Sequence, residues 1–142
     1  MSLKGINAYK KGNLKEEVAT ADPHKLTLML MQGSLDRIAY AKGAMERKDF
    51  VSKAEYISKA SSIILHLRDT LDREIGGEFA ENLFALYDYF IDRLNYAHVN
   101  NEIRCLDEVY NLLSPIKDAW AQIPQEAKLE AFEKQGRDRA AM

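Results

Sequence analysis

The chain contains 142 residues, and its 20 lysines and arginines against 22 aspartates and glutamates give a formal net charge of −2. This length suits one domain without metal or disulfide support, and the interspersed charges offer no basic surface for nucleic acid or anionic lipid. No apolar run approaches the ~20 residues of a membrane span, and the amino terminus lacks the apolar core of a secretory signal, so we expect a cytoplasmic protein.

Residues 1–21 form a predicted arm ahead of the first helix. Ile6, Tyr9, Leu14 and Val18 are apolar residues in an otherwise polar stretch that contains glycine. Exposed apolar residues of this kind usually dock on another surface. We therefore predict a flexible arm whose apolar side chains, Ile6 and Tyr9 above all, contact something outside the arm.

The first predicted helix begins at Asp22 and Pro23, which suit an N-cap and a first helical position, and runs to about Arg47. Its apolar residues occupy more of the circumference than one core face needs. Two stripes compete for the core and the sequence leaves both open. One comprises Leu28, Met31, Leu35, Ile38 and Met45, interrupted by Lys42; the other comprises Leu26, Met29, Leu30, Gly33, Tyr40, Ala41 and Ala44, interrupted by Arg37.

Gly33 stands inside this helix, where glycine costs ~1 kcal/mol relative to alanine. Its presence suggests close approach by another helix or a bound segment, and a tolerated accident is the alternative. After a short connection at Lys48 and Asp49, a second helix is predicted from about Phe50 to Glu74, ending at Gly76 and Gly77 as a C-cap. Its core side is expected to comprise Ala54, Ile57, Ile64, Leu67 and Leu71.

The third predicted helix, from about Glu78 to His98, carries more large apolar residues than one buried face can use. Its core stripe is expected to comprise Phe79, Leu83, Leu86, Tyr87, Phe90, Ile91 and Leu94. Tyr89 and Tyr96 fall on a separate side with Asn82 and Arg93, a composition favoured at protein contacts. The alternative is that a neighbouring element covers these tyrosines.

A turn at residues 99–101 leads to the fourth predicted helix, which continues to Ile123, before Pro124. Its apolar residues at three- and four-residue steps are Ile103, Leu106, Val109, Tyr110, Leu113, Ile116, Trp120 and Ile123. Pro115 should kink this helix or split it near Leu113. Cys105 is expected to be a small buried thiol.

The predicted architecture is all-α, an up-and-down antiparallel four-helix bundle, because helices of 20 to 25 residues joined by short connections pack as antiparallel neighbours. We predict a single domain over 1–142. It consists of the arm (1–21), the bundle (22–124) and a weakly ordered tail (125–142), whose apolar content is low.

Catalytic constellations are poor in this sequence. It contains no Glu-x-x-His pair, HExxH, cysteine pair, P-loop or calcium loop, so we expect no catalytic residue, metal site or cofactor. A histidine phosphotransfer bundle is the main alternative, and His66 is its only mid-helix candidate. The apolar neighbours of His66 and Asp69 one turn later favour instead a satisfied, partly buried histidine.

Three ordered motifs resemble the FliS-type flagellin secretion chaperones: TADPHKLTLMLMQGSLDRI in the first helix, GGEFAENLFALYDYFIDRLNYAHVNNE across the third, and LLSPIKDAW in the fourth. The likeness extends from Ile6 to about Trp120. It implies a cytoplasmic, non-enzymatic chaperone of flagellar type III export that binds the C-terminal segment of flagellin, prevents premature polymerisation and aids delivery to the export apparatus. A component of the export gate is a second implied partner. A purely structural adaptor bundle is a further alternative.

The predicted partner-binding residues come from the arm, the first helix and the third helix. The arm is expected to occupy part of the client groove in the free protein and to be displaced or rearranged on binding. The predicted set comprises Ile6, Tyr9, Leu26, Leu30, Gly33, Asn82, Leu86, Tyr89, Arg93 and Tyr96.

Overall fold

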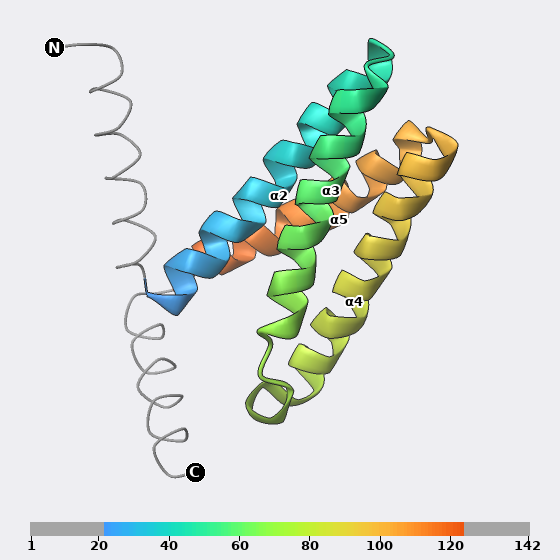
Figure 1. Ribbon diagram of the computed structural model, residues 1–142. Helices are drawn as coiled ribbons and strands as arrows, with labels where there is room; N and C mark the ends of the chain where they lie inside the picture. The colour runs from blue at the N-terminus through green and yellow to red at the C-terminus, as the bar shows by residue number, and fades with distance from the viewer. Residues whose placement is uncertain (1–21, 124–142) are drawn as a thin grey trace, which may run out of the picture. The chain divides into compact units, whose positions relative to one another are not determined.

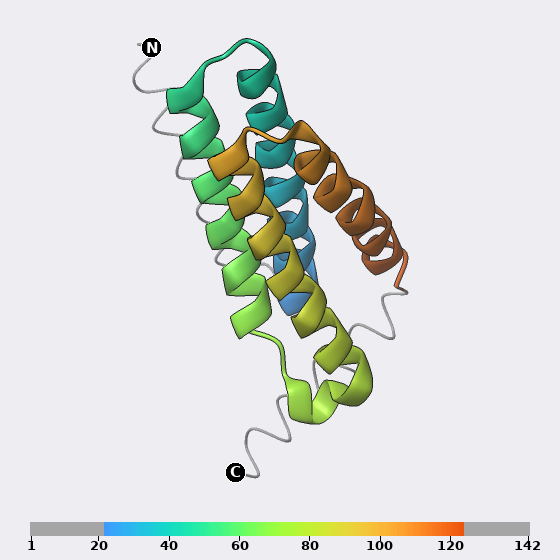
Figure 2. The same cartoon turned by 90° about the vertical axis from the view of Figure 1, so that its right-hand side faces the viewer.

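A computed structural model describes residues 22–123 of the chain. Within them, helices α2 (Pro23–Glu46), α3 (Phe50–Asp69), α4 (Arg73–Asn100) and α5 (Ile103–Ala121) follow one another through short connections (Figure 1). Successive helices reverse direction, and α3 and α4 lie side by side in both views (Figures 1 and 2). The described residues contain no strand, and the all-α four-helix bundle is confirmed. The predicted arm (1–21) and tail (125–142) lie outside the described residues.

An acidic side chain begins each helix by accepting a hydrogen bond from a backbone N–H of the first turn. Asp22 accepts from the N–H of Lys25 at 2.7 Å, which confirms the predicted N-cap of α2. Asp49 begins α3, Asp72 begins α4 and Glu102 begins α5 in the same way. These caps satisfy donors that a helix leaves unpaired at its start, and they place a negative charge at the positive end of the helix dipole.

The boundary between α3 and α4 differs from the sequence prediction. Helix α3 ends at Asp69, where the Thr70 N–H donates to the carbonyl oxygen of His66 at 3.0 Å, and Asp72 already caps α4. Gly76 and Gly77 therefore lie inside α4 and do not form a C-cap of α3. Gly77 has φ 56° and ψ −137°, so α4 consists of two helical segments joined by a kink at this residue. The predicted positive φ was therefore correct, and the predicted end of the second helix was wrong.

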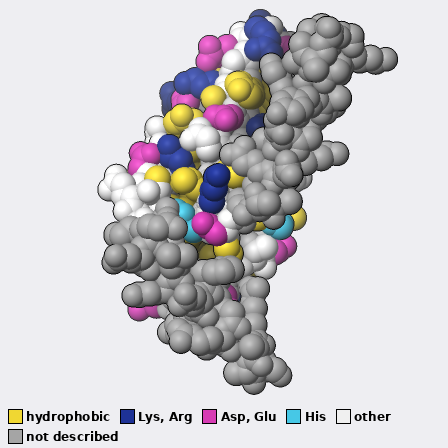
Figure 3. Space-filling model, turned by 90° about the vertical axis from the view of Figure 1, so that its left-hand side faces the viewer, with side chains coloured by type: hydrophobic (Ala, Val, Ile, Leu, Met, Phe, Trp, Pro, Cys, Tyr) yellow, Lys and Arg dark blue, Asp and Glu magenta, His cyan; other side chains and the backbone are white. Residues whose placement is uncertain are grey.

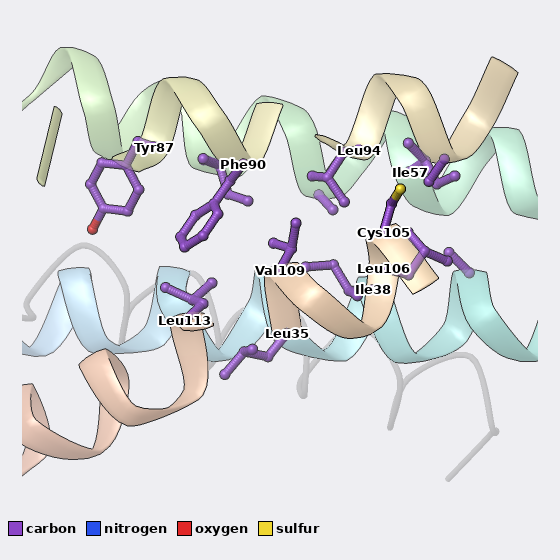
Figure 4. Packing of buried hydrophobic residues seen from close by; sticks show 14 of the residues in the cluster. Leu35, Ile38, Ile57, Tyr87, Phe90, Leu94, Cys105, Leu106, Val109 and Leu113 are labelled. Carbon is purple, nitrogen blue, oxygen red and sulfur yellow. The ribbon is translucent and has the colours of Figure 1, made fainter. Parts of the chain in front are cut away.

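Side chains from all four helices form one core cluster (Figure 4). From α2 this core takes Met31, Leu35, Ile38 and Met45, which decides between the two competing stripes in favour of the one that contains Lys42. The side chain of Lys42 is half-exposed, and its Nζ lies 2.9 Å from Oδ1 of Asp107 on α5. Ala41 and Ala44, from the competing stripe, are also buried. The thiol of Cys105 is buried, as predicted.

Two residues expected in the core are exposed, and one expected break does not occur. Phe79, just after the Gly77 interruption, is 64% exposed, and Tyr110 of α5 also faces outward. Helix α5 runs uninterrupted through Pro115, so the proline does not split it. The carbonyl that Pro115 leaves without a helical donor belongs to Asn111, which is exposed and accessible to water.

Lys53 joins α3 to the end of α4 from a buried position. It is only 5% exposed, and its Nζ donates to the carbonyl oxygen of His98 at 3.0 Å and to Oδ1 of Asn101 at 2.6 Å. Asn101 adopts the left-handed conformation, with φ 51° and ψ 43°, at the turn before α5. The lysine therefore caps the C-terminus of α4, where a cation is favourable.

Candidate functional site

The predicted contact residues of α4 meet α5 through one carboxylate. Tyr89 Oη donates to Oε1 of Glu108 at 2.6 Å, and Nε of Arg93 donates to the same oxygen at 3.1 Å. The guanidinium of Arg93 also lies over the ring of Tyr96, 5.1 Å from its centroid. Tyr89, Arg93 and Tyr96 follow at four- and three-residue steps, so they share one side of α4. We call Tyr89, Arg93, Tyr96 and Glu108 the α4–α5 face.

Both tyrosines of the α4–α5 face remain accessible. Tyr89 is 41% exposed and Tyr96 is 48% exposed, although a neighbouring helix supplies Glu108 beside them. The outcome therefore combines the two alternatives left by the sequence: α5 contacts Tyr89 through Glu108 but covers neither ring. Both rings offer apolar surface, and the hydroxyl of Tyr89 is already bonded, which is typical of residues at protein interfaces.

The electrostatics of this face depend on Glu108. Its hydrogen bond with the Tyr89 hydroxyl, more than any other contribution, raises the pKa of that hydroxyl. Arg93 carries the opposite charge beside Glu108, and its Nη2 lies 2.9 Å from Sγ of Cys105. Burial raises the pKa of the Cys105 thiol. The face therefore holds a paired guanidinium and carboxylate and a protonated tyrosine hydroxyl at neutral pH.

The remaining predicted residues of α4 differ in their surroundings. Asn82 is exposed, two turns before Tyr89 on the same side of the helix. Leu86 is half-buried and packs against the core cluster. It therefore contributes to folding and offers only part of its side chain to a partner.

The predicted residues of α2 lie on a different helix pair. Leu30 is half-buried and packs against the core cluster. A Cβ added at Gly33 would lie 3.7 Å from Cδ1 of Ile63 on α3, an ordinary van der Waals contact, so close helix approach does not require this glycine. Leu26 is half-buried in the first turn of α2. Ile6 and Tyr9 lie outside the described residues.

A groove between α3 and α4 was not predicted from the sequence. Its volume is about 460 Å³, and small side chains on α3 leave it open. The Nδ1 atom of His98 is buried there without a hydrogen-bond partner among the described residues. The signal that could have indicated it is the run of serines at helical spacing on α3. The lining residues are Ala54, Ile57, Ser58, Ser61, Ser62, Leu65, Ile91, Asn95 and His98.

A metal ion requires a group of ligating side chains, and a membrane span requires a long apolar helix. Within residues 22–123, no three His, Cys, Asp or Glu side chains are grouped to hold a metal ion, and no helix is long and apolar enough to cross a membrane. Acidic and basic side chains alternate with apolar ones on the described surface in Figure 3. His66 is exposed, which contradicts the expectation of a partly buried ring. It lies on the last turns of α3, where the core side is formed by Ile64 and Leu67.

The sequence family described as "Flagellar protein FliS" matches residues 5–127 of the chain. The chain belongs to the FliS family. The relatives named flagellar secretion chaperone include proteins from three organisms with well-covered alignments. The Pseudomonas aeruginosa protein FliSB is 44% identical over 84% of this chain and 94% of its own. FliS of Salmonella typhimurium is 42% identical over 89% of this chain and 94% of its own length. FliS of Vibrio cholerae is 39% identical over 85% of this chain and 89% of its own length.

A solved structure has the same fold. The crystal structure of a bacterial flagellar chaperone superposes with a TM-score of 0.66, covering 82% of this chain and 94% of that protein at 18% sequence identity. The family assignment and this fold agree with the resemblance seen in the sequence motifs. They give no support to the phosphotransfer bundle that His66 suggested.

Proposed function

We propose that this chain is a flagellar secretion chaperone that binds the C-terminal segment of flagellin in the cytoplasm. In this role it prevents premature polymerisation of flagellin and aids its delivery to the flagellar type III export apparatus, one of whose components is a further expected partner. The observation that carries the proposal is family membership, with relatives of that name aligned over most of both chains. The proposal includes no catalytic step.

The physical chemistry of a client segment supports this role. A helical segment that has left its filament is marginally stable alone in water, because the cost of nucleating a helix exceeds the gain from a few turns. It gains order when its apolar side lies against a preformed helical surface. The half-exposed rings of Tyr89 and Tyr96 provide such a surface on α4. Because ordering costs several kcal/mol, the contact must be extended.

The test is calorimetric titration of this protein with flagellin from the same organism, with and without the flagellin C-terminal segment. Full-length flagellin should form a stoichiometric complex, and the truncated flagellin should not bind. Unchanged affinity for truncated flagellin would contradict the proposed recognition.

Variants of α4 separate binding from folding. Tyr89→Ala and Arg93→Ala should lower affinity by about tenfold or more, because truncated interfacial Tyr and Arg commonly have effects of this size. Tyr110→Ala, which removes another exposed tyrosine, is the matched control and should bind normally. Leu83→Ala removes a core side chain and should lower the free energy of unfolding by about 2 to 5 kcal/mol. If Tyr89→Ala unfolds the protein as Leu83→Ala does, Tyr89 is a structural residue.

A further inference from the structure

The α4–α5 face is held together by a residue of α5 that the sequence did not single out. Oε1 of Glu108 accepts hydrogen bonds from Tyr89 at 2.6 Å and from Arg93 at 3.1 Å. These two donors lie one helical turn apart on α4, so a single oxygen fixes the rotamers of both. Long side chains such as Arg lose considerable rotamer entropy when they are immobilised on binding. A face that is already fixed in the free protein avoids part of that cost.

The arrangement also decides what kind of side chain the face can receive. Arg93 is paired with Glu108, lies against Cys105 and stacks on Tyr96. A client carboxylate would have to replace Glu108 to pair with Arg93, which exchanges one ion pair for another and gains little. By helical spacing, Asp92 lies beside Tyr89 and Arg104 lies one turn before Glu108, and their charges are opposite. Glu78 lies three turns before Tyr89 on the same side of α4, and the charge of Glu102 acts on the Cys105 thiol. What remains for a partner is the half-exposed aromatic surface of Tyr89 and Tyr96.

We propose that Glu108 is a positioning residue for client binding: its carboxylate holds Tyr89 and Arg93 in the arrangement that receives an uncharged, apolar side chain of the flagellin C-terminal segment. This inference rests on the proposed function. Beyond that function, the inference names Glu108 as the residue that positions the contact, and it names the chemical class of the client side chain. Electrostatic neutrality of the face predicts that binding there depends little on ionic strength.

The experiment compares Glu108→Ala and Glu108→Gln with Asp107→Ala. Asp107 is the preceding residue of α5, and its exposed ion pair with Lys42 makes it a matched loss of one carboxylate outside the α4–α5 face. The first measurement needs no client. The Cζ resonance of Tyr89, labelled with ¹³C and assigned with Tyr89→Phe, is titrated from about pH 8 to about pH 12. Glu108→Ala should lower the pKa of Tyr89 towards the ordinary tyrosine value of about 10, and Asp107→Ala should leave it unchanged.

The second measurement is calorimetric titration with the flagellin C-terminal segment at about 50 mM and about 500 mM salt. Glu108→Ala should weaken binding by about tenfold, because Tyr89 and Arg93 are released together. Glu108→Gln, whose amide oxygen still accepts a hydrogen bond from Tyr89, should show a smaller loss. Asp107→Ala should bind within about twofold of the unaltered protein, whose affinity should itself change by less than about threefold between the two salt concentrations.

Each result bears on a separate statement. An unchanged Tyr89 pKa in Glu108→Ala overturns the positioning contact. A lowered pKa with unchanged affinity overturns the role of Glu108 in binding and leaves the chaperone function intact. A loss of affinity of about tenfold or more at the higher salt concentration overturns the apolar client side chain. Failure of the unaltered protein to bind the segment contradicts the chaperone function itself, and the inference with it.

Discussion

The buried ammonium of Lys53 gives a sharp test of how the bundle is held together. The variant Lys53→Met keeps most of the apolar stem and removes the charge and both hydrogen bonds to the end of α4. The carbonyl oxygen of His98 and Oδ1 of Asn101 then lose their donor. Lys53 itself is only 5% exposed, whereas His98 is half-buried and Asn101 is exposed.

The expected cost follows from these contacts. A hydrogen bond that involves a charged group contributes about 1.5 to 3 kcal/mol. Asn101 is exposed and His98 is half-buried, so water replaces part of what the two acceptors lose. Removal of the buried ammonium offsets part of the loss, because its desolvation penalty disappears with it. We therefore expect Lys53→Met to lower the free energy of unfolding by about 2 to 3 kcal/mol. Asn101→Gly, which tolerates the left-handed backbone and removes one acceptor, should cost about half as much.

The assay is equilibrium urea unfolding followed by circular dichroism. With a slope of about 2 kcal/mol per molar urea, Lys53→Met should lower the midpoint by about 1 M. Lys59→Met is the matched control, because Lys59 lies on the same helix in an exposed pair with Glu55, and its loss should cost less than about 0.5 kcal/mol. If Lys53→Met is no more destabilising than Lys59→Met, the buried cap contributes nothing to stability and the reasoning is wrong.

Two further predictions concern Tyr87 and Gly77. Burial raises the pKa of Tyr87 to about 12, so the unfolded chain loses this proton first and the protein should lose about 2 to 3 kcal/mol of stability between about pH 10 and about pH 12; Tyr87→Phe should remove that part of the pH dependence in urea titrations. Gly77→Ala should lower the free energy of unfolding by about 1 to 3 kcal/mol, because φ of 56° and ψ of −137° are unfavourable for a residue with Cβ. The cost is one of backbone conformation alone, since the added Cβ would have no atom within 4 Å apart from those of the adjoining backbone. Its control, Gly43→Ala in the interior of α2, should be neutral or stabilising by up to ~1 kcal/mol, and equal effects at both sites would refute the backbone argument.

Much of the fold could be predicted because the helix boundaries and apolar stripes indicated by the local sequence are those that the bundle uses. Asp22 and Pro23 begin α2 as predicted, and the periodic residues of α4 such as Leu83, Phe90 and Leu94 are buried. The end of α3 was not predictable from glycine alone. Asp72 caps a new helix before Gly76 and Gly77 are reached. In the sequence, an aspartate at this position and two glycines a few residues later both indicate a helix boundary, and the pattern alone does not say which of them ends α3.

The choice between the two stripes of α2 shows a different limit. Each stripe contained one long basic residue, and periodicity assigns the same penalty to both. In the structure, the half-exposed Lys42 pairs with Asp107 on α5, whereas Arg37 donates to the carbonyl of Gly33 on its own helix. A partner on another helix cannot be seen in the sequence of one helix.

The residue types of the candidate site could be predicted from the sequence, but the hydrogen bonds that join its side chains could not. The sequence predicts that Tyr89, Arg93 and Tyr96 are surplus to the core, and the exposure of the two tyrosines agrees with that interpretation. Glu108 was not predicted as part of the site, because a glutamate on a predicted helix is most simply interpreted as a solvent-exposed charge. Its hydrogen bonds to Tyr89 and Arg93 depend on how α5 packs beside α4. The groove beside His98 was missed for the same reason, since the serines of α3 have no meaning without α4 next to them.

The positions of the candidate residues constrain any client that uses all of them. Along α4, Asn82 and Tyr96 are 14 positions apart, which corresponds to about 21 Å of helix. Leu30 and Gly33 belong to α2, and Gly33 faces Ile63 of α3. One short helix cannot lie along both surfaces, because they belong to different pairs of helices in the bundle. A client that contacts both must be extended and must change direction between them. We expect such a segment to be disordered when free, so the surface that orders it gains by being rigid beforehand. Under the proposed function, the hydrogen bonds of Glu108 to Tyr89 and Arg93 supply that rigidity on the side formed by α4 and α5.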